Sequence, residues 1–197
     1  MTIRPFLLGI NIRSECCQRT FMASDIRFKH PFTCIIGGPT ASGKSTFCIR
    51  FLQNLDTLST EPDFPGGIIC CYSEQSVVPH QTLAALRKNL RVREGLPEKF
   101  ENAQGLPCLF ILDDLLNEVF SRAVCDPFTK GSHHRNLSVI LITQNFFHQA
   151  PHCRDISLNA KYLVALKNVR DRNQFAYLAW QMLPEASLNI FPLFTLE

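Results

Sequence analysis

The sequence predicts an α/β fold in which a mostly parallel β-sheet is flanked by helices. Short, continuously apolar segments recur along the 197 residues, and helical or loop segments separate them. Such strands are typical of a parallel sheet covered on both faces, because a solvated face would show alternating polarity. A glycine-rich loop follows the first of these segments. At this length we expect one domain with a single substantial core.

The first strand and the first helix surround the glycine-rich loop. Residues 32–37 are apolar with β-branched members, which predicts a buried strand. From Lys44 onward, apolar side chains recur at roughly helical spacing until the turn-forming cluster of residues 62–67. The loop is therefore expected to lie between a strand and the helix that it opens.

The remaining elements follow the same alternation. We expect further strands at residues 67–72, 108–112, 137–143 and 161–167, helices at 81–89 and 115–124, and a connection at 97–107. Ligands bind parallel sheets at the carboxyl ends of the strands. The glycine loop, the pair Asp113-Asp114 and Gln144 each follow a strand end, so we expect them to meet at one edge.

Composition excludes some classes of protein. The net charge of +3 and pI near 8.4 permit a DNA partner but are too small to predict one. The nine cysteines form no C-x-x-C pair, and several lie in apolar segments. We expect most to be free core residues of a protein in a reducing compartment, the cytosol or nucleus. No apolar run approaches the roughly 18 residues of a membrane span, so neither membrane insertion nor secretion is expected.

The glycine-rich loop carries the strongest motif. Its sequence, G-P-T-A-S-G-K-S, matches the phosphate-binding pattern G-x-x-x-x-G-K-[ST], in which backbone N–H groups and a helix N-terminus meet phosphate oxygens. Lys44 is expected to reach the β- and γ-phosphates, and Ser45 to offer a hydroxyl to Mg²⁺. The predicted nucleotide-binding residues are Gly38, Pro39, Thr40, Ala41, Ser42, Gly43, Lys44, Ser45 and Thr46.

An acidic pair follows the strand at residues 108–112. Asp113 stands where a Walker B aspartate holds the Mg²⁺ shell, and Asp114 occupies the next position, from which an acid can orient and deprotonate the attacking water. The alternative is that the pair only caps the following helix, since acids favour helix N-termini. We interpret Asp113 as a metal ligand and Asp114 as a catalytic acid–base group.

Two further polar residues follow later strands. Gln144 ends the strand at 137–143, from which an amide can contact the γ-phosphate or the attacking water. Arg170 and Arg172 follow the strand at 161–167, and either arginine could enter a neighbouring subunit's site or simply be a solvated loop charge.

Histidines and aromatic residues carry weaker signals. The pairs His133-His134 and His152-Cys153 are adjacent rather than spaced four apart and lack a matched partner nearby in the sequence, so we expect surface-loop residues and no metal site. Phe146-Phe147 could stack on bases, but most aromatic residues in such a chain are core residues.

Taken in order, these motifs resemble the FtsK/HerA superfamily, and more closely the small genome-packaging ATPases of poxviruses, Polintons and adintoviruses. The resemblance covers residues 28–181, between an N-terminal extension at 1–27 and a tail at 182–197 that is expected to be truncated. The segments that carry it are the P-loop, Leu112-Asp113-Asp114, Ile142-Thr143-Gln144-Asn145, Ser157-Leu158-Asn159-Ala160 and Lys167-Asn168-Val169-Arg170-Asp171.

The resemblance implies a RecA/FtsK-like P-loop ATPase that uses ATP and Mg²⁺. It implies a homo-oligomeric ring, a pentamer or hexamer, that pumps double-stranded DNA into a viral capsid, with capsid or portal proteins as partners. Gln144 would be the sensor and Arg170 the arginine finger. The implied location is the virion or the host cytoplasm or nucleus.

Two other functions stay open, and one is excluded. A small nucleotide or nucleoside kinase shares the length, P-loop and parallel sheet, although the Thr-Gln-Asn strand end argues against it. An ATP-binding scaffold with weak hydrolysis is favoured by the aspartate at 114 and the short C-terminus. A GTPase is excluded because the chain has no N-K-x-D motif and no D-x-x-G after the Walker B strand.

Overall fold

The protein is an α/β structure built on a six-stranded, all-parallel sheet. The computed structural model describes residues 27–73, 83, 85–100, 105–113, 115, 122–146, 152–166 and 177. The strands are β1 (Thr33–Gly37), β2 (Gly67–Tyr72), β3 (Leu90–Glu94), β4 (Cys108–Asp113), β5 (Leu137–Thr143) and β6 (Tyr162–Ala165). Apart from Arg27, the predicted extension at 1–27 and the tail at 182–197 lie outside the described residues.

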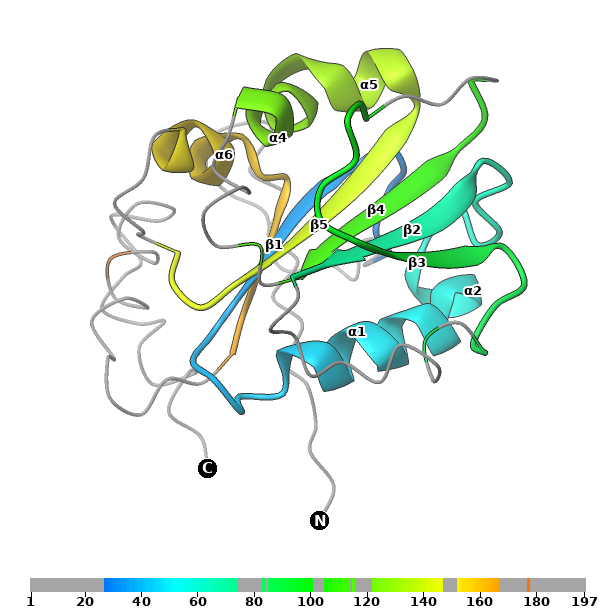
Figure 1. The fold of residues 1–197 in the computed structure, drawn as a ribbon, viewed down its shortest axis with the longest axis horizontal. Helices are drawn as coiled ribbons and strands as arrows, with labels where there is room; N and C mark the ends of the chain where they lie inside the picture. Colours follow the sequence, from blue (N-terminus) through cyan, green and yellow to red (C-terminus); the bar gives the residue numbers. More distant parts are fainter. Residues whose placement is uncertain are drawn as a thin grey trace, which may run out of the picture.

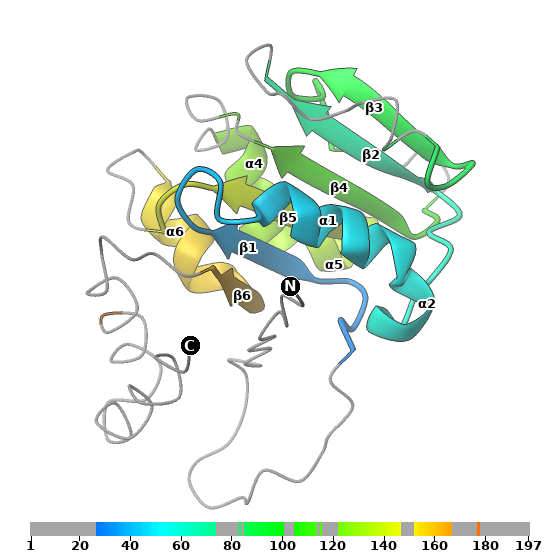
Figure 2. The ribbon, with the colours of Figure 1, turned by 90° about the horizontal axis from the view of Figure 1, so that it is seen from below.

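The strand order is β3-β2-β4-β5-β1-β6, so β5 lies between the strand that enters the glycine loop and the strand that ends at Asp113. All the strands point the same way, and their carboxyl ends share one edge, where the loop after β1 turns into α1 (Figure 2). The central strands β1 and β5 are buried along their whole length. Their continuous apolar sequences follow from this burial on both faces.

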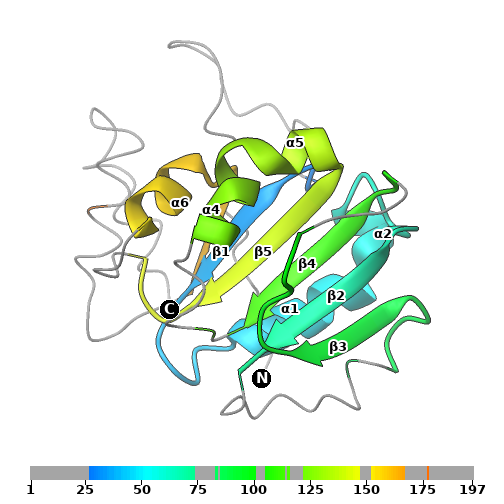
Figure 3. The ribbon, with the colours of Figure 1, turned by 45° about the horizontal axis from the view of Figure 1, so that its top comes forward.

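Helices cover both faces of the sheet (Figure 1). On one face lie α1 (Lys44–Gln53) and the short α2 (Leu55–Leu58), which together correspond to the single helix expected between Lys44 and Pro62. On the other face lie α4 (Arg122–Asp126), the π-helical segment η1 (Pro127–Gly131), α5 (Ser132–Arg135) and α6 (Cys153–Asn159) (Figure 3). The sheet thus separates two apolar clusters, one on each face.

Each cluster is a packed layer of aromatic and aliphatic side chains. On the α1 face, Phe51 and Leu52 are fully buried and Phe28 contacts the Phe51 ring edge-on, with centroids 5.1 Å apart. On the opposite face, Phe110 packs edge-on against Phe100 with centroids 5.1 Å apart. The two layers fix α1 on one side and the α4–α6 group on the other, which holds the loops at the strand ends in place.

The sequence prediction was wrong in one region of the sheet. We expected a helix at residues 81–89 and five strands. Leu83 is helical and residues 81, 82 and 84 lie outside the described part, but residues 85, 86, 88 and 89 form turns and Leu90–Glu94 is a sixth strand, β3. Apolar and polar residues alternate in β3 over only a short stretch, and the arginines lie on one face. This face tolerates charge because β3 lies at the edge of the sheet, where only Leu90 is buried. A five-residue edge strand gives little apolar signal to separate it from a helix end.

The other expected elements agree more closely with the structure. Strands at 67–72 and 137–143 have the expected bounds, and those at 32–37, 108–112 and 161–167 shift by one or two residues. Of the helix expected at 115–124, Leu115 is not helical, Arg122–Asp126 is α4 and the residues between lie outside the described part. Among the described residues, no helix has the length and apolar character of a membrane span.

Candidate functional site

The glycine-rich loop connects the end of β1 to the start of α1. The Gly38 N–H donates to the Thr143 carbonyl oxygen at 3.2 Å, and the Leu166 N–H donates to the Gly37 carbonyl oxygen at 2.8 Å. These bonds tie the loop to the ends of β5 and β6, the two neighbours of β1. Ser42 N–H donates to the Pro39 carbonyl oxygen at 3.2 Å and closes the turn inside the loop.

The glycines of the loop are required by close contacts and by backbone conformation. A Cβ on Gly38 would lie 2.7 Å from Ser42 Oγ and 2.9 Å from Leu166 Cβ, and a Cβ on Gly37, the last residue of β1, would overlap the Phe146 ring. Gly43 has φ of 96°, a left-handed conformation that glycine adopts without strain. Ser42 Oγ is buried without a hydrogen-bond partner, which leaves a polar atom available inside the loop.

Lys44 is the first residue of α1 and its side chain crosses the loop. Its Nζ donates to the carbonyl oxygens of Gly38 at 2.7 Å and Pro39 at 2.9 Å. The ammonium group therefore lies against the same backbone that would surround a phosphate chain. The first turn of α1 contains no acidic residue, so the positive end of its dipole is not neutralised by a carboxylate of that turn.

Asp113 ends β4 at the same edge of the sheet. It is paired in register with Tyr72 of β2 and Ile142 of β5, while Gly37 of β1 is paired with Thr143 of β5. Since Ile142 and Thr143 are neighbours in β5, the last residues of β1 and β4 differ by only one residue in their position along the sheet. Asp113 and Ser45 both line one cavity between α1 and the sheet, of about 380 Å³ including the open solvent at its mouth.

Most of that cavity is apolar and carries thiols rather than further acids. Cys48 of α1 and Cys70 of β2 line it. Burial raises the pKa of the Cys70 thiol to about 12, and the charges of Cys71 and Asp113 add to the effect. Burial is also the main cause of the raised pKa of the Cys48 thiol, and the charge of Asp113 is the next largest cause. Both thiols are therefore protonated at neutral pH, and Asp113 is the one carboxyl residue among the lining residues.

Gln144 directly follows β5 and is exposed at the strand-end edge. The turn that carries it is held by Thr143, whose hydroxyl donates to the Asn145 carbonyl oxygen at 3.1 Å and accepts from the Asn145 N–H at 3.3 Å. Because β5 lies between β1 and β4, Gln144 follows the strand between the glycine loop and Asp113. Phe146, two residues on, is buried against Gly37, so it is a core residue as expected.

The structure brings together the glycine loop, Ser45, Asp113 and the strand end at Gln144. Asp114, Arg170 and Arg172 lie outside the described residues, and their roles stay predictions. Sequence reasoning missed Tyr72, which ends β2 opposite Asp113 and lines the cavity with it. Tyr72 follows a run of apolar residues, and this is the same sequence signal that identified Asp113.

Expectations for cysteines and histidines had mixed outcomes. The seven described cysteines are free and buried, as expected. His133 and His134 belong to the helix α5 rather than to a loop. The expectation that His152 lacks partners was wrong, because ligand atoms of Cys125, His152 and Asp155 lie within 4.8 Å of one another. Residues 27 positions apart in the sequence meet here because α4 and α6 pack side by side, which local spacing cannot predict.

A nucleoside triphosphate and a magnesium ion fit the residues of this edge. Gly38, with no room for a Cβ, and Ser42 Oγ, buried without a partner, form a backbone cradle suited to phosphate oxygens. Ser45 and Asp113 provide a hydroxyl and a carboxylate on one cavity, and hard oxygen donors are what Mg²⁺ prefers.

Comparisons with known proteins identify the fold. No protein-family model matches the sequence, and no curated protein is significantly similar to it. Among solved structures, the genome packaging NTPase B204 of Sulfolobus turreted icosahedral virus 2 in complex with ATP-gammaS is similar, with a TM-score of 0.52 and 17% identity over 84% of this chain and 87% of that chain. The same protein with sulfate gives a TM-score of 0.49 and 14% identity, over 84% and 87% of the two chains. At this identity the likeness shows that the chain has an α/β fold matching that of a P-loop NTPase.

Proposed function

We propose that this protein is a Mg²⁺-dependent ATPase that drives the packaging of double-stranded DNA into a viral or virus-like capsid. The observation that carries the proposal is the convergence of the complete phosphate-binding loop, Ser45 and Asp113 at the carboxyl edge of one parallel sheet. Brought to one edge, these groups serve the binding and hydrolysis of a nucleoside triphosphate.

The glycine loop binds the triphosphate. Residues 38–46 surround the β- and γ-phosphates with backbone N–H groups at the unneutralised N-terminus of α1. Lys44 exchanges its bonds to the Gly38 and Pro39 carbonyls for bonds to phosphate oxygens. The positive charge of Lys44 stabilises the negative charge that gathers on the transferred group in the transition state.

Ser45 and Asp113 hold the magnesium ion of the nucleotide. When bound, Mg²⁺ supplies charge neutralisation at the β- and γ-phosphate oxygens. Asp114 accepts a proton from the attacking water while the water oxygen bonds to the γ-phosphorus and the bond to ADP breaks. Gln144 orients that water by its amide, from the strand end between the glycine loop and Asp113.

The packaging role rests on the order of the motifs and on the fold. The solved structure with the similar fold is described as a genome packaging NTPase in complex with ATP-gammaS. In the proposed assembly, a homo-oligomeric ring of five or six subunits pulls double-stranded DNA through its centre and docks on capsid or portal proteins. Such a protein acts in the virion or in the host cytoplasm or nucleus.

ATP turnover measured with and without double-stranded DNA, beside the mass of the assembly, tests this function. We expect a ring whose turnover rises when double-stranded DNA is added. A monomer that transfers the γ-phosphate to a nucleotide or nucleoside would instead identify a kinase. A chain that binds ATP without steady turnover, with or without DNA, would identify a nucleotide-binding scaffold.

Arg170 is proposed to complete the site of the neighbouring subunit. We expect Arg170→Ala to lower turnover by about 1,000-fold in the assembled ring, since arginine fingers contribute about 10³–10⁵ to turnover. Mixing Arg170→Ala with Lys44→Ala subunits should restore some activity, because mixed neighbours can form one intact site. Arg172→Ala is the matched control and should leave turnover nearly unchanged. A mixture whose activity is only the sum of its parts would argue against a shared site.

A further inference from the structure

We propose that Cys125, His152 and Asp155 form a binding site for a zinc-like transition-metal ion, separate from the nucleotide site, that joins α4 to α6. One ligand atom from each residue lies within 4.8 Å of the other two. Thiolate sulfur, imidazole nitrogen and carboxylate oxygen are the three donor types that bind Zn²⁺ in proteins. The inference does not depend on the proposed ATPase function, because none of the three residues belongs to the glycine loop or lines its cavity.

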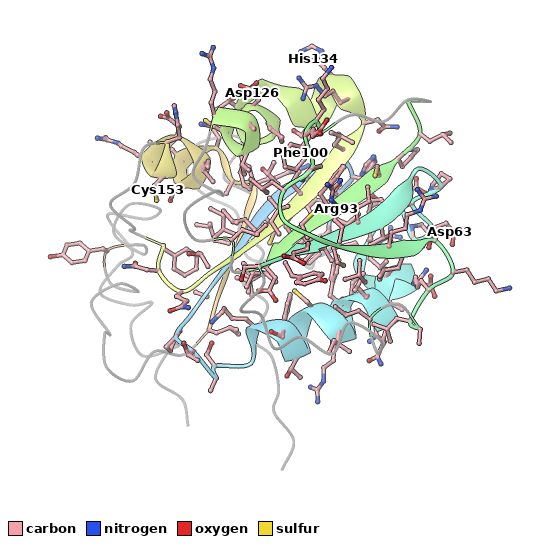
Figure 4. All side chains as sticks on the ribbon, viewed as in Figure 1. Asp63, Arg93, Phe100, Asp126, His134 and Cys153 are labelled. Carbon is pink, nitrogen blue, oxygen red and sulfur yellow. The ribbon has the colours of Figure 1, made fainter. Side chains whose placement is uncertain are left out.

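The donors come from two separate elements of the fold. Cys125 lies on α4, whereas His152 precedes α6 and Asp155 lies in its first turn. Figures 1 and 3 show α4 and α6 side by side on the same face of the sheet. Figure 4 labels Asp126 and Cys153, the sequence neighbours of Cys125 and His152, on these two elements. A metal ion here would therefore cross-link segments that are distant in the sequence.

The spacing of the donors suits a tetrahedral ion after a small contraction. His152 Nδ1 and Asp155 Oδ2 are 3.8 Å apart, which is too long for a hydrogen bond. With the usual bond lengths to sulfur, nitrogen and oxygen, donor atoms around tetrahedral Zn²⁺ lie about 3.4–3.6 Å from one another. The observed upper limit of 4.8 Å is about 1 Å longer, and rotation of two exposed side chains can close that difference.

The three donors differ in burial, with the sulfur on the protein side and the other two donors toward solvent. Cys125 is buried, while the side chains of His152 and Asp155 are 39% and 61% exposed. An ion can therefore enter from solvent past these two side chains and bind the buried sulfur. Burial raises the pKa of the Cys125 thiol, and the charges of Asp155 and Asp126 raise it further.

A simpler interpretation assigns each residue a local role, and the structure argues against it. An acid in the first turn favours the helix dipole, and a residue at the N-cap often bonds to the helix backbone. His152 makes no such side-chain bond, and it holds a left-handed backbone with φ of 62°, which costs free energy for a residue other than glycine. Packing in the apolar cluster of this face places Cys125 beside α6, but the cap role does not account for the approach of the His152 and Asp155 donor atoms to its sulfur.

The ion would also fix one end of the connection that carries Gln144. That connection leaves β5 at Thr143, and its far end is His152, the residue that opens α6. Phe146 already anchors the near end against Gly37. Bound metal at His152 would anchor the far end to α4, on the face of the sheet opposite α1.

Cobalt binding to the full-length chain tests the site. The metal-free protein, kept reduced by a non-thiol reductant, is titrated with Co²⁺ and then with Zn²⁺. We expect one Co²⁺ per chain with a thiolate-to-cobalt charge-transfer band and the strong visible bands of a four-coordinate ion, all removed by one equivalent of Zn²⁺. Zn²⁺ should also raise the melting temperature of the parent protein, because the assembled site of the folded state binds the ion more tightly than the separate cysteines and histidines of the unfolded chain.

Single substitutions assign the ligands. Cys125→Ser should abolish the charge-transfer band, and Asp155→Asn should weaken binding more than about tenfold, since even outer-shell partners contribute 10–100-fold. Asp155 is exposed, so this variant should fold normally even if Cys125→Ser does not. Cys153→Ser is the matched control, because the Cys153 sulfur points to the Phe146 carbonyl oxygen at 3.9 Å and Cys153 lies outside the three-residue group. A parent spectrum without the charge-transfer band, or one that Asp155→Asn leaves unchanged, would overturn the proposal.

Discussion

Replacement of Lys44 by alanine is expected to lower ATP turnover by about 100-fold or more. Its ammonium group lies against the Gly38 and Pro39 carbonyl oxygens, 2.7 and 2.9 Å away, where a triphosphate would run. The loss of one preorganised group that stabilises transition-state charge typically lowers turnover by about 10²–10³. Affinity for ATP should fall as well, because the same charge meets the phosphates before reaction. Steady-state phosphate release under saturating ATP measures the effect.

A matched lysine separates this role from a general loss of positive charge. Lys88 is exposed in the turn before β3 and touches neither the glycine loop nor the cavity under α1. We expect Lys88→Ala to keep the turnover of the parent protein. Thermal melting of both variants should show that neither unfolds at the assay temperature. Turnover of Lys44→Ala equal to that of Lys88→Ala would remove the glycine loop from the proposed mechanism.

Substitution of Asp113 by asparagine should affect the magnesium-dependent part of the reaction. The change keeps the shape of the side chain and removes the one carboxylate that lines the cavity with Ser45. We expect turnover to fall by about 100-fold, within the range for loss of one preorganised electrostatic group. Nucleotide affinity measured in excess EDTA should stay close to that of the parent, because the glycine loop is unchanged. Affinity measured with Mg²⁺ should fall.

Asp63→Asn is the control for this substitution. Asp63 is exposed in the turn before β2 and is not among the residues that line the cavity with Asp113. It should retain full turnover and the full difference in affinity between Mg²⁺ and EDTA. If Asp113→Asn weakened binding equally with and without Mg²⁺, its role would be structural rather than that of a magnesium ligand.

The sequence predicted the buried central strands and the loop that follows β1 better than the elements at the sides of the sheet. The buried strands β1, β4 and β5 are continuous apolar runs, and such runs identify strands of a parallel sheet covered on both faces. The place of the glycine loop between β1 and α1 was predictable because its motif is formed by residues adjacent in the chain. The places of Asp113 and Gln144 at the strand-end edge were predictable because Asp113 ends β4 and Gln144 directly follows β5. Their roles in the reaction stay predictions.

Elements that depend on tertiary packing were not predictable in the same way. The edge strand β3 buries only Leu90, and its alternation of apolar and polar residues is too short to separate a strand from a helix end. Cys125 and His152 meet only because two short helices pack on one face of the sheet, and no local motif records that contact. Tyr72 became a candidate only once the register placed it opposite Asp113.

We propose that one edge of the sheet, formed by the glycine loop, Ser45 and Asp113, hydrolyses ATP with magnesium. ATP turnover by the purified parent protein, compared in Mg²⁺ and in excess EDTA, tests it most directly. A turnover within about 1–100 s⁻¹ in Mg²⁺, as is typical of enzymes of phosphoryl transfer, that is lost in EDTA is the predicted result. The claim would be contradicted by ATP that remains intact in Mg²⁺, or by turnover that persists unchanged in EDTA.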